Sequence, residues 1–155
     1  MEDVEFTRAV PGDLAEIRAL LVSAELPAAD IEPHISNFIV ARAGQELIGS
    51  IGIEVAGDAG LLRSLAVRPP YRGRGIAETL CSRLEGYARA LGVRRLYLLT
   101  TTAEGYFRKR GYQRVPRSEA PAGVQSTHEF RSACPSTAAC MRKDLVEAGA
   151  EAART

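Results

Sequence analysis

Residues 61–101 constrain the fold more than any other part of the chain. Residues 61–67 (LLRSLAV) are apolar almost throughout, which is typical of a strand covered on both faces. Residues 95–101 (RLYLLTT) indicate a second strand. Between them, apolar residues three or four positions apart predict an amphipathic helix over 74–91, at Ile76, Leu80, Leu84, Tyr87, Ala88 and Leu91. A strand, a helix and a strand in this order predict a parallel pair with a right-handed crossover.

The N-terminal part predicts a strand followed by helix. A strand is expected at 4–9, before a Pro-Gly turn. Asp13 is expected to be the N-cap of a helix over 13–25, and Glu16 would complete a capping box. A weaker helical stretch is expected at 28–36.

The remaining segments complete a mixed α/β fold. Runs at 38–43 and 46–55 are joined by short glycine-containing turns, so with 61–67 they predict an antiparallel meander. After the second parallel strand we expect, in order, a short helix at 103–110, a strand at 112–115, an irregular segment at 116–136 and a last strand at 138–145. Residues 1–145 are predicted to form one α/β domain with flanking helices, and residues 146–155 a disordered tail.

The charge of the chain is unevenly distributed. The formal net charge is +1, yet the segment from Arg63 to Arg117 holds 13 basic and three acidic residues, and the remainder holds 7 basic and 16 acidic residues. This basic region is too local for a protein that coats nucleic acid. It predicts a small polyanionic ligand instead.

Composition excludes other classes of protein. No apolar run approaches the ~20 residues that span a bilayer, and the first residues do not resemble a signal peptide, so no membrane partner is expected. Three cysteines without a CxxC pair indicate reduced thiols in the cytoplasm. With two histidines, a His-rich metal site is not expected, so we predict no metal.

The loop before the long helix has the composition of a phosphate-binding turn. Gly73 and Gly75 leave the first amides of a helix accessible, where the helix dipole attracts anions. Arg72 and Arg74 add guanidinium groups that suit phosphate oxygens. The dinucleotide and P-loop motifs are both absent, because Glu78 occupies a required glycine position and no Gly-Lys-Ser/Thr run exists. An ordinary basic turn is the alternative.

The pattern Arg72-x-x-Gly75-x-Ala77, directly after a strand ending Leu65-Ala66-Val67, resembles the acyl-CoA motif of the GNAT family of N-acetyltransferases. The order of elements over 4–145 agrees with that family's fold, which has a mixed sheet whose middle strands splay apart. The resemblance implies that acetyl-CoA is the co-substrate. It also implies cofactor-binding roles for the backbone of Leu65, Ala66 and Val67 on pantetheine, and for Arg72, Gly73, Arg74, Gly75, Ile76 and Ala77 on the pyrophosphate.

The resemblance also directs the search for acid and base residues. Glu54, near the end of an apolar strand, is the leading candidate for the base, acting directly or through water, and an exposed strand-end glutamate is the alternative. The family commonly has a tyrosine four residues before a Gly-aromatic pair, beside the coenzyme. That pair is Gly111-Tyr112 here and the matching residue is Phe107, which cannot donate a proton, so no acid is assigned.

Two groups within the family are most similar. The Leu98-Leu99-Thr100-Thr101 run followed by Phe107 is similar to the acetyltransferase domain of N-acetylglutamate synthases. Other stretches resemble N-acetyltransferases encoded beside arsenic-resistance genes, namely residues 60–67, 100–103, Glu129-Phe130, Cys134-Pro135 and Met141.

Polar residues in or beside the middle strands are candidates for acceptor binding: Arg63, Thr100, Thr101 and Arg117. Arg63 interrupts an apolar strand and needs an anionic partner, which is either a substrate carboxylate or an internal salt bridge with Glu54. The 116–136 segment is expected to form a wall or lid over the acceptor, and alternation along it would place Thr127 and Glu129 on one inward side. A solvated connector is the alternative. Cys134 and Cys140 are expected to be inert thiols rather than ligands of trivalent arsenic.

The sequence therefore predicts an N-acetyltransferase that acts by direct transfer in a ternary complex on a small amino-acid-like amine, in a detoxification step linked to arsenic resistance. A protein lysine or N-terminal acetyltransferase is one alternative, and a non-catalytic acyl-CoA-sensing module is another. Family members often dimerise, so a homodimer is a candidate assembly.

Overall fold

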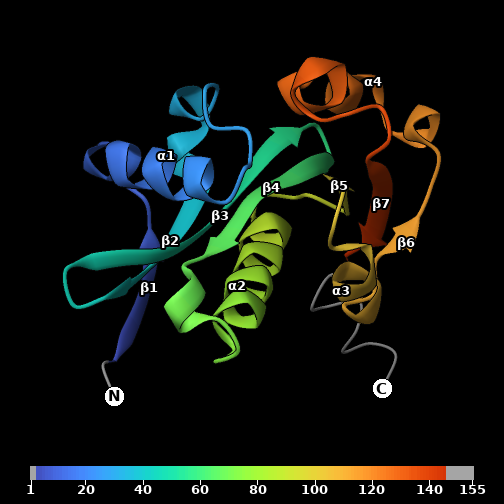
Figure 1. Cartoon of the computed structure of the whole chain (residues 1–155). Coiled ribbons are helices and arrows are strands. Elements are labelled where there is room, and N and C mark those ends of the chain that lie inside the picture. The colour runs from blue at the N-terminus through green and yellow to red at the C-terminus, as the bar shows by residue number, and fades with distance from the viewer. Residues whose placement is uncertain (1–2, 146–155) are drawn as a thin grey trace. The chain divides into compact units, whose positions relative to one another are not determined.

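The structure is a computed structural model that describes residues 3–145 (Figure 1). The tail predicted at 146–155 lies outside the described residues. Seven strands form one mixed sheet in the order β1-β2-β3-β4-β5-β7-β6, which confirms the predicted α/β class. Within the described residues the chain divides into two compact units, one comprising 3–54 with 62–85 and the other 55–61 with 86–145.

The first unit is built on an antiparallel meander. Its elements are β1 (Val4–Arg8), α1 (Leu14–Ser23), the 3-10 helix η2 (Glu32–Asn37), β2 (Phe38–Ala43), and parts of β3 (Glu46–Ala56), β4 (Ala59–Val67) and α2 (Ile76–Ala90). β2 pairs antiparallel with both β1 and β3. The predicted strands and the long helix are confirmed within a few residues at each end.

The two helices of this unit cover opposite faces of the meander. Val40 packs in a core cluster with Ile17 and Leu21 of α1. The next residue, Ala41, pairs with Gly49, and a Cβ at Gly49 would lie 3.2 Å from Leu80 of α2. Successive strand residues point to opposite faces, so α1 lies on one face and α2 on the other.

The second unit contains the predicted parallel pair. β4 and β5 (Arg95–Thr100) pair in parallel over Ala59–Leu61, and β7 (Ala139–Asp144) pairs antiparallel with both β5 and the two-residue β6 (Gln113–Arg114). α3 (Glu104–Lys109) precedes β6. Tyr97, Val124 and Cys140 are among the residues of its core cluster. The predicted splaying of the middle strands stays a prediction.

Asp13 occupies the N-cap position of α1 as predicted, but the predicted capping box with Glu16 is wrong. Residues Pro11–Asp13 form a 3-10 turn, and Asp13 makes no side-chain capping bond to α1. Its carboxylate instead accepts hydrogen bonds from the Val10 amide and from Arg42, which also binds Glu16. The distant strand residue Arg42 draws both acids away from the roles that local spacing assigns to them.

The segment 116–136 is more regular than predicted. It forms a 3-10 turn at Arg117–Glu119, the short helix α4 (Ala122–Gln125) and one π-helical turn, η5 (Glu129–Ala133). Three prolines suggested an irregular chain, yet Pro116 and Pro121 each stand immediately before a helical turn, where a missing amide proton costs nothing.

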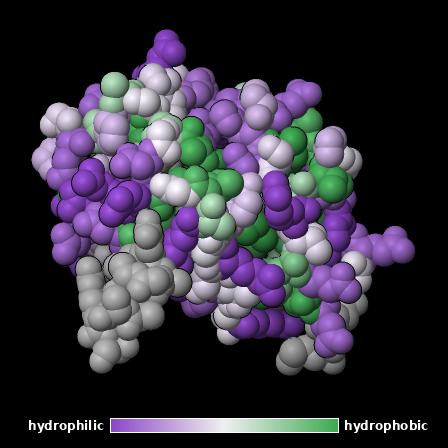
Figure 2. Space-filling model, turned by 180° about the vertical axis from the view of Figure 1, so that it is seen from behind, coloured by the Kyte–Doolittle hydropathy of each residue, from purple (hydrophilic) through white to green (hydrophobic). Residues whose placement is uncertain are grey.

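Few large hydrophobic side chains are exposed among the described residues, namely Val10, Val22, Val55 and Leu91. Figure 2 shows hydrophobic residues in separate groups among hydrophilic ones on the face it presents. Within residues 3–145, no helix combines the length and the apolar character needed to cross a membrane.

Candidate active site

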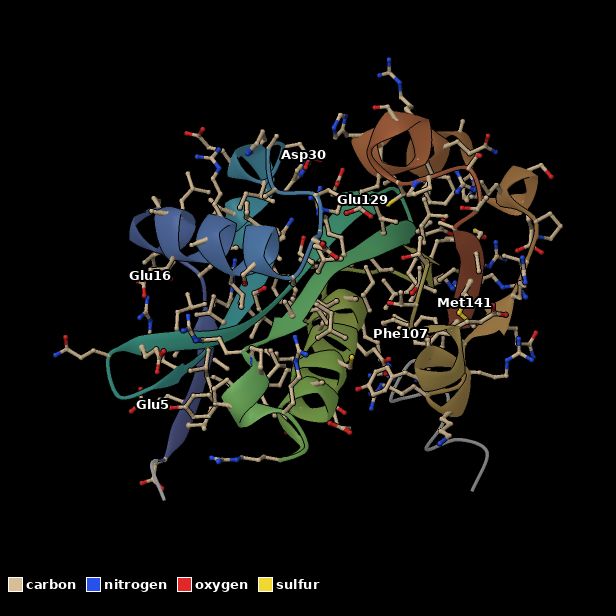
Figure 3. The ribbon with its side chains drawn as sticks, in the orientation of Figure 1. Glu5, Glu16, Asp30, Phe107, Glu129 and Met141 are labelled. Atoms are coloured by element: carbon tan, nitrogen blue, oxygen red, sulfur yellow. The ribbon has the colours of Figure 1, made fainter. Side chains whose placement is uncertain are left out.

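Four charged or titratable side chains meet on the α1 face of the first unit. Glu54 Oε2 accepts a hydrogen bond of 2.7 Å from Arg63 Nη1, and Asp30 binds both terminal nitrogens of Arg63 at 2.6 and 2.8 Å. His34 Nε2 lies 3.4 Å from Glu54 Oε1. Figure 3 labels Asp30 on the segment that joins α1 to β2. The internal salt bridge considered for Arg63 is therefore present.

The Arg63 guanidinium is fully engaged inside the protein. Its side chain is 0% exposed, and a guanidinium has five N–H donors. Nε donates to Ser64 Oγ, Nη1 donates to Asp30 and Glu54, and Nη2 donates to Asp30 and to the Pro27 carbonyl. A substrate carboxylate could reach this group only by replacing one of its present acceptors.

Glu54 lies on the face of β3 against which Phe38, the first residue of β2, packs. Strand alternation places it on the same face as Gly52, where a Cβ would meet the Phe38 ring at 2.5 Å. Glycine at 52 thus allows the Phe38 ring to pack against this face of β3. Glu54 is buried, so the alternative of an exposed strand-end glutamate does not apply.

Ser64 adopts a left-handed backbone conformation inside β4. Its φ of 62° lies in the region that residues other than glycine rarely occupy. Ser50 Oγ donates to the Ser64 carbonyl oxygen at 2.8 Å, and Ser64 Oγ accepts from Arg63 Nε at 3.0 Å. These two bonds hold a strained residue directly before Leu65, Ala66 and Val67, the stretch predicted to bind pantetheine.

The loop from β4 to α2 has the geometry of an anion-binding turn. Gly73 and Gly75 have φ values of 77° and 81°, and a Cβ on either would meet no described atom within 4 Å. The first α-helical bond runs from the Thr79 amide to the Gly75 carbonyl, so the amides of Ile76 and Ala77 precede it in the first turn. An anion can approach this turn closely, since glycine presents no side chain there.

The two arginines of this loop are anchored at its ends. Arg72 donates from Nε to the Val67 carbonyl at 2.9 Å, which ties the loop to the end of β4. The Arg74 guanidinium lies 5.3 Å from the centre of the Tyr71 ring, a cation–π distance. Their partners thus lie at the end of β4 and within the loop itself.

In the second unit, Thr100 and Phe107 have structural partners. Thr100 Oγ1 accepts a hydrogen bond from the Ala103 amide at 2.9 Å and so stabilises the turn into α3, while Thr101 is exposed. Phe107 is buried, and its ring meets Tyr106 and Tyr112 edge to face at centroid distances of 5.3 and 5.5 Å. A phenylalanine at this position thus serves the packing between α3 and the residue before β6.

Arg117 lines a cavity of about 410 Å³. Its guanidinium donates to the carbonyl oxygens of Pro135 and Ala138, which are neutral groups. Among residues 3–145, no carboxylate pairs with Arg117. The other lining residues are Arg114, Val115, Pro116, Ser136, Ala138 and Cys140.

Thr127 and Glu129 are buried, but the alternation expected to bring them there is absent. They lie at a helical turn, where Thr127 Oγ1 donates to the Val124 carbonyl at 2.7 Å. Figure 3 shows Glu129 on the segment between α4 and β7, and the Cys134 thiol lies 3.6 Å from its Oε1. Both side chains face the interior because α4 and η5 fold the segment onto itself.

All three cysteines are free thiols. Cys140 is buried among apolar neighbours, and this burial raises the pKa of its thiol to about 11, an effect that nearby Arg117 partly opposes. A protonated thiol is a poor nucleophile and a poor ligand for soft ions. This environment supports the expectation that Cys140 is inert.

Three residues of the site escaped the sequence analysis, namely Asp30, His34 and Ser64. Asp30 and His34 lie on a segment with only weak helical periodicity, and no local pattern links them to a strand that begins later in the chain. The burial of Arg63 in an apolar strand was a usable signal, because it required acidic partners. It could not say which acids these were.

The motif predicted from the loop is matched by a family comparison. A model of the acetyltransferase (GNAT) family matches residues 9–112, more than half of the chain. The match includes β4, the Gly73–Gly75 turn, α2 and the Glu54–Arg63 pair. The chain belongs to the acetyltransferase (GNAT) family.

Among curated proteins, the chain is similar to amino-acid acetyltransferases. The amino-acid acetyltransferase of Azotobacter vinelandii is 38% identical over 103 residues, which are 65% of this chain and 24% of that protein. The amino-acid acetyltransferase of Pseudomonas aeruginosa is 37% identical over the same length. This chain therefore spans about a quarter of the length of these relatives.

Solved structures share the fold over nearly the whole chain. N-acetylglutamate synthase from Neisseria gonorrhoeae, crystallised with coenzyme A and L-arginine, superposes with a TM-score of 0.79 at 25% identity. The match covers 94% of this chain and 34% of that one. A GNAT-family acetyltransferase from Staphylococcus aureus Mu50 superposes with a TM-score of 0.76 at 15% identity, over 93% and 100% of the two chains. The predicted GNAT fold is confirmed.

Proposed function

We propose that the protein is an acetyl-CoA-dependent N-acetyltransferase that acetylates the primary amine of a small amino-acid-like molecule by direct attack in a ternary complex. The observation that carries this proposal is the Glu54 carboxylate, which is buried on β3, the strand next to β4. Arg63 of β4 holds it there. Family membership and the similarity to amino-acid acetyltransferases support the reaction and the class of acceptor.

The loop and the start of α2 fit the phosphates of the co-substrate. The open space above Gly73 and Gly75 admits an anion, and the first-turn amides with Arg72 and Arg74 offer donors of the right sign. In this proposal Leu65, Ala66 and Val67 bind pantetheine through their backbone, and Phe107 contributes an apolar surface. Acetyl-CoA brings the activated acyl group, and the protein orients it.

Glu54 is the proposed base. An amine attacks a carbonyl only in its neutral form, so a base must take a proton from the ammonium group. A carboxylate buried on a strand and fixed by Arg63 is positioned for that transfer with little reorganisation. No residue of the chain is assigned as the acid that protonates the sulfur.

The acceptor is proposed to carry a carboxylate, and Arg117 is the better candidate to bind it. Arg63 already binds two carboxylates, whereas Arg117 binds neutral carbonyl groups and lines a cavity. A guanidinium with only neutral partners gains more from a new anion than one already paired. Thr100, Thr101, Thr127 and Glu129 are proposed to line the acceptor site, and a substrate role for Arg63 requires displacement of Asp30.

Release of free thiol from acetyl-CoA, measured across a panel of amines, tests the function. We expect turnover with carboxylate-bearing amines, with a loss of about 10²-fold or more in Glu54→Gln and none in Glu5→Gln, a control at an exposed glutamate of β1. Turnover restricted to peptide lysines or N-termini would identify a protein acetyltransferase. Binding of acetyl-CoA without turnover on any amine would identify an acyl-CoA sensor.

The finer context of the reaction is also a proposal. Resemblance to acetyltransferases encoded beside arsenic-resistance genes suggests that the acceptor is a toxic amine and that acetylation in the cytoplasm detoxifies it. A homodimer is the proposed assembly. Growth of a deletion strain on toxic amino-acid analogues, with and without the gene, tests the detoxification role.

A further inference from the structure

The two oxygens of the Glu54 carboxylate face different kinds of partner. Oε2 accepts a 2.7 Å hydrogen bond from Arg63, and Oε1 lies 3.4 Å from His34 Nε2. The Glu54 side chain is 10% exposed and the His34 side chain is 32% exposed. His34 thus stands between a buried carboxylate and the solvent.

Only one of these two partners can carry a proton away. A guanidinium stays protonated at any pH at which proteins are folded, so Arg63 fixes the carboxylate but cannot accept a proton from it. An imidazole both accepts and donates protons near neutral pH. The 3.4 Å separation is long for a hydrogen bond, as is common for proton-transfer pairs before substrate binds.

Other charges around the pair come from three elements. Asp30, from the segment before η2, and Arg63, from β4, form an ion pair on the Oε2 side. Glu32, in the first turn of η2, lies 3.9 Å from Arg18 of α1. Each of these acids has a basic partner, so His34 is the group beside Glu54 that is suited to exchanging protons with water.

We propose that His34 carries to the solvent the proton that Glu54 takes from the acceptor amine. His34 acts through Glu54 and is a positioning residue, and the inference rests on the proposed acetyltransferase function. It adds to that function a residue and a route that neither the sequence motif nor the comparisons assign.

The overall reaction conserves atoms and charge. An ammonium R–NH3⁺ and acetyl-CoA give R–NH–acetyl, CoA–SH and one H⁺. The N–C bond forms and the C–S bond breaks, and the sulfur ends with one of the two protons that leave nitrogen. The other passes from nitrogen to the Glu54 carboxylate, then from Oε1 to His34 Nε2, and the resulting imidazolium releases a proton to water.

The test compares His34→Gln with His128→Gln, because the chain has two histidines and His128 is exposed in the second unit. Glutamine keeps a polar contact with Glu54 but cannot carry a proton. We expect kcat to fall about tenfold in His34→Gln, with an unchanged KM for acetyl-CoA and a pH–rate profile that differs from the wild type. His128→Gln is expected to match the wild type.

Chemical rescue separates proton transfer from structural support. Added imidazole should raise the kcat of His34→Ala several-fold. It should have little effect on the kcat of His34→Gln and should not rescue Glu54→Gln. In ring-nitrogen NMR spectra of the protein without substrates, Glu54→Gln should shift the His34 Nε2 signal and leave that of His128 unchanged.

Each result has a separate meaning. Wild-type kcat at all pH values in His34→Gln, no rescue of His34→Ala by imidazole, or an unshifted His34 signal would overturn the inference while leaving the acetyltransferase intact. An absence of turnover in the wild type itself would overturn the proposed function and the inference with it.

Discussion

Arg63 Nε donates a hydrogen bond to Ser64 Oγ at 3.0 Å, although neighbouring residues of a regular strand point to opposite faces. The left-handed φ of Ser64 interrupts this alternation and brings both side chains to one face. One irregular residue thus links the backbone of β4 to the guanidinium that holds Glu54.

Substitutions at Ser64 test whether its left-handed backbone stores strain. Ser64→Val should lower the free energy of unfolding by about 2–3 kcal/mol, because a β-branched residue fits poorly at positive φ and the hydroxyl acceptor is lost. Ser64→Gly relieves the strain of the positive φ and loses only the hydroxyl. Its free energy of unfolding should therefore stay within about 1 kcal/mol of the wild type. Urea unfolding measures both values, and equal stabilities would argue against a strained residue 64.

A glycine pair tests the phosphate-binding turn. Gly75→Ala forces a side chain to a φ of 81° and should displace the first-turn amides, which we expect to raise the KM for acetyl-CoA about tenfold. Gly57 has a φ of 63° and equally open surroundings in the turn between β3 and β4. Gly57→Ala should therefore cost similar stability without changing that KM. If both variants keep the wild-type KM, the turn does not bind the co-substrate.

Two arginine variants test where the acceptor carboxylate binds. Arg117→Ala should raise the KM for carboxylate-bearing amines about tenfold more than the KM for alkylamines, because an ion pair is lost only with the former. Arg63→Ala should raise the KM for both kinds of amine alike. It should also destabilise the fold by about 3–5 kcal/mol, since it leaves Asp30 and Glu54 without their shared cation. Selective loss in Arg63→Ala instead would restore the sequence-based assignment of Arg63 to the substrate.

The raised pKa of the Cys140 thiol leads to a prediction about how alkylation and stability depend on pH. Burial raises its folded-state pKa to about 11, so at pH 8 its thiolate fraction is about 100-fold below that of a thiol with the ordinary value of 9.0. Alkylation of the folded protein should therefore modify the half-buried Cys134 first. A raised pKa adds stability below pH 9 that is lost as the pH rises toward 11. Unfolding measured from pH 8 to 10 should show this loss in the wild type and a smaller one in Cys140→Ala.

The parts of the fold that depend on local spacing were predictable. The apolar stripe of α2 and the Arg72-x-x-Gly75-x-Ala77 turn are each contained in one short segment, and the structure contains both. Glu54 and Arg63 were predicted to be a base and a buried cation, because a charged residue in an apolar strand requires a partner of opposite charge or a functional role.

The parts that depend on distant partners were not predictable. Asp13 and Glu16 fit a capping box until Arg42 binds them both. Asp30 and His34 reach Arg63 and Glu54 only after α1 and η2 fold over the sheet. The positive φ of Ser64 has no marker in the sequence, because the residue that adopts it is not glycine.

The contrast between β3 and η2 has a dynamic consequence. Glu54 follows a run of fully buried residues in β3, whereas η2 contains no buried residue at all. Local opening of η2 therefore exposes little apolar surface, while opening of β3 exposes part of the core. Amide hydrogens of η2 should exchange with deuterium far faster than those of β3. The carboxylate would then stay in place while the imidazole swings between it and bulk water.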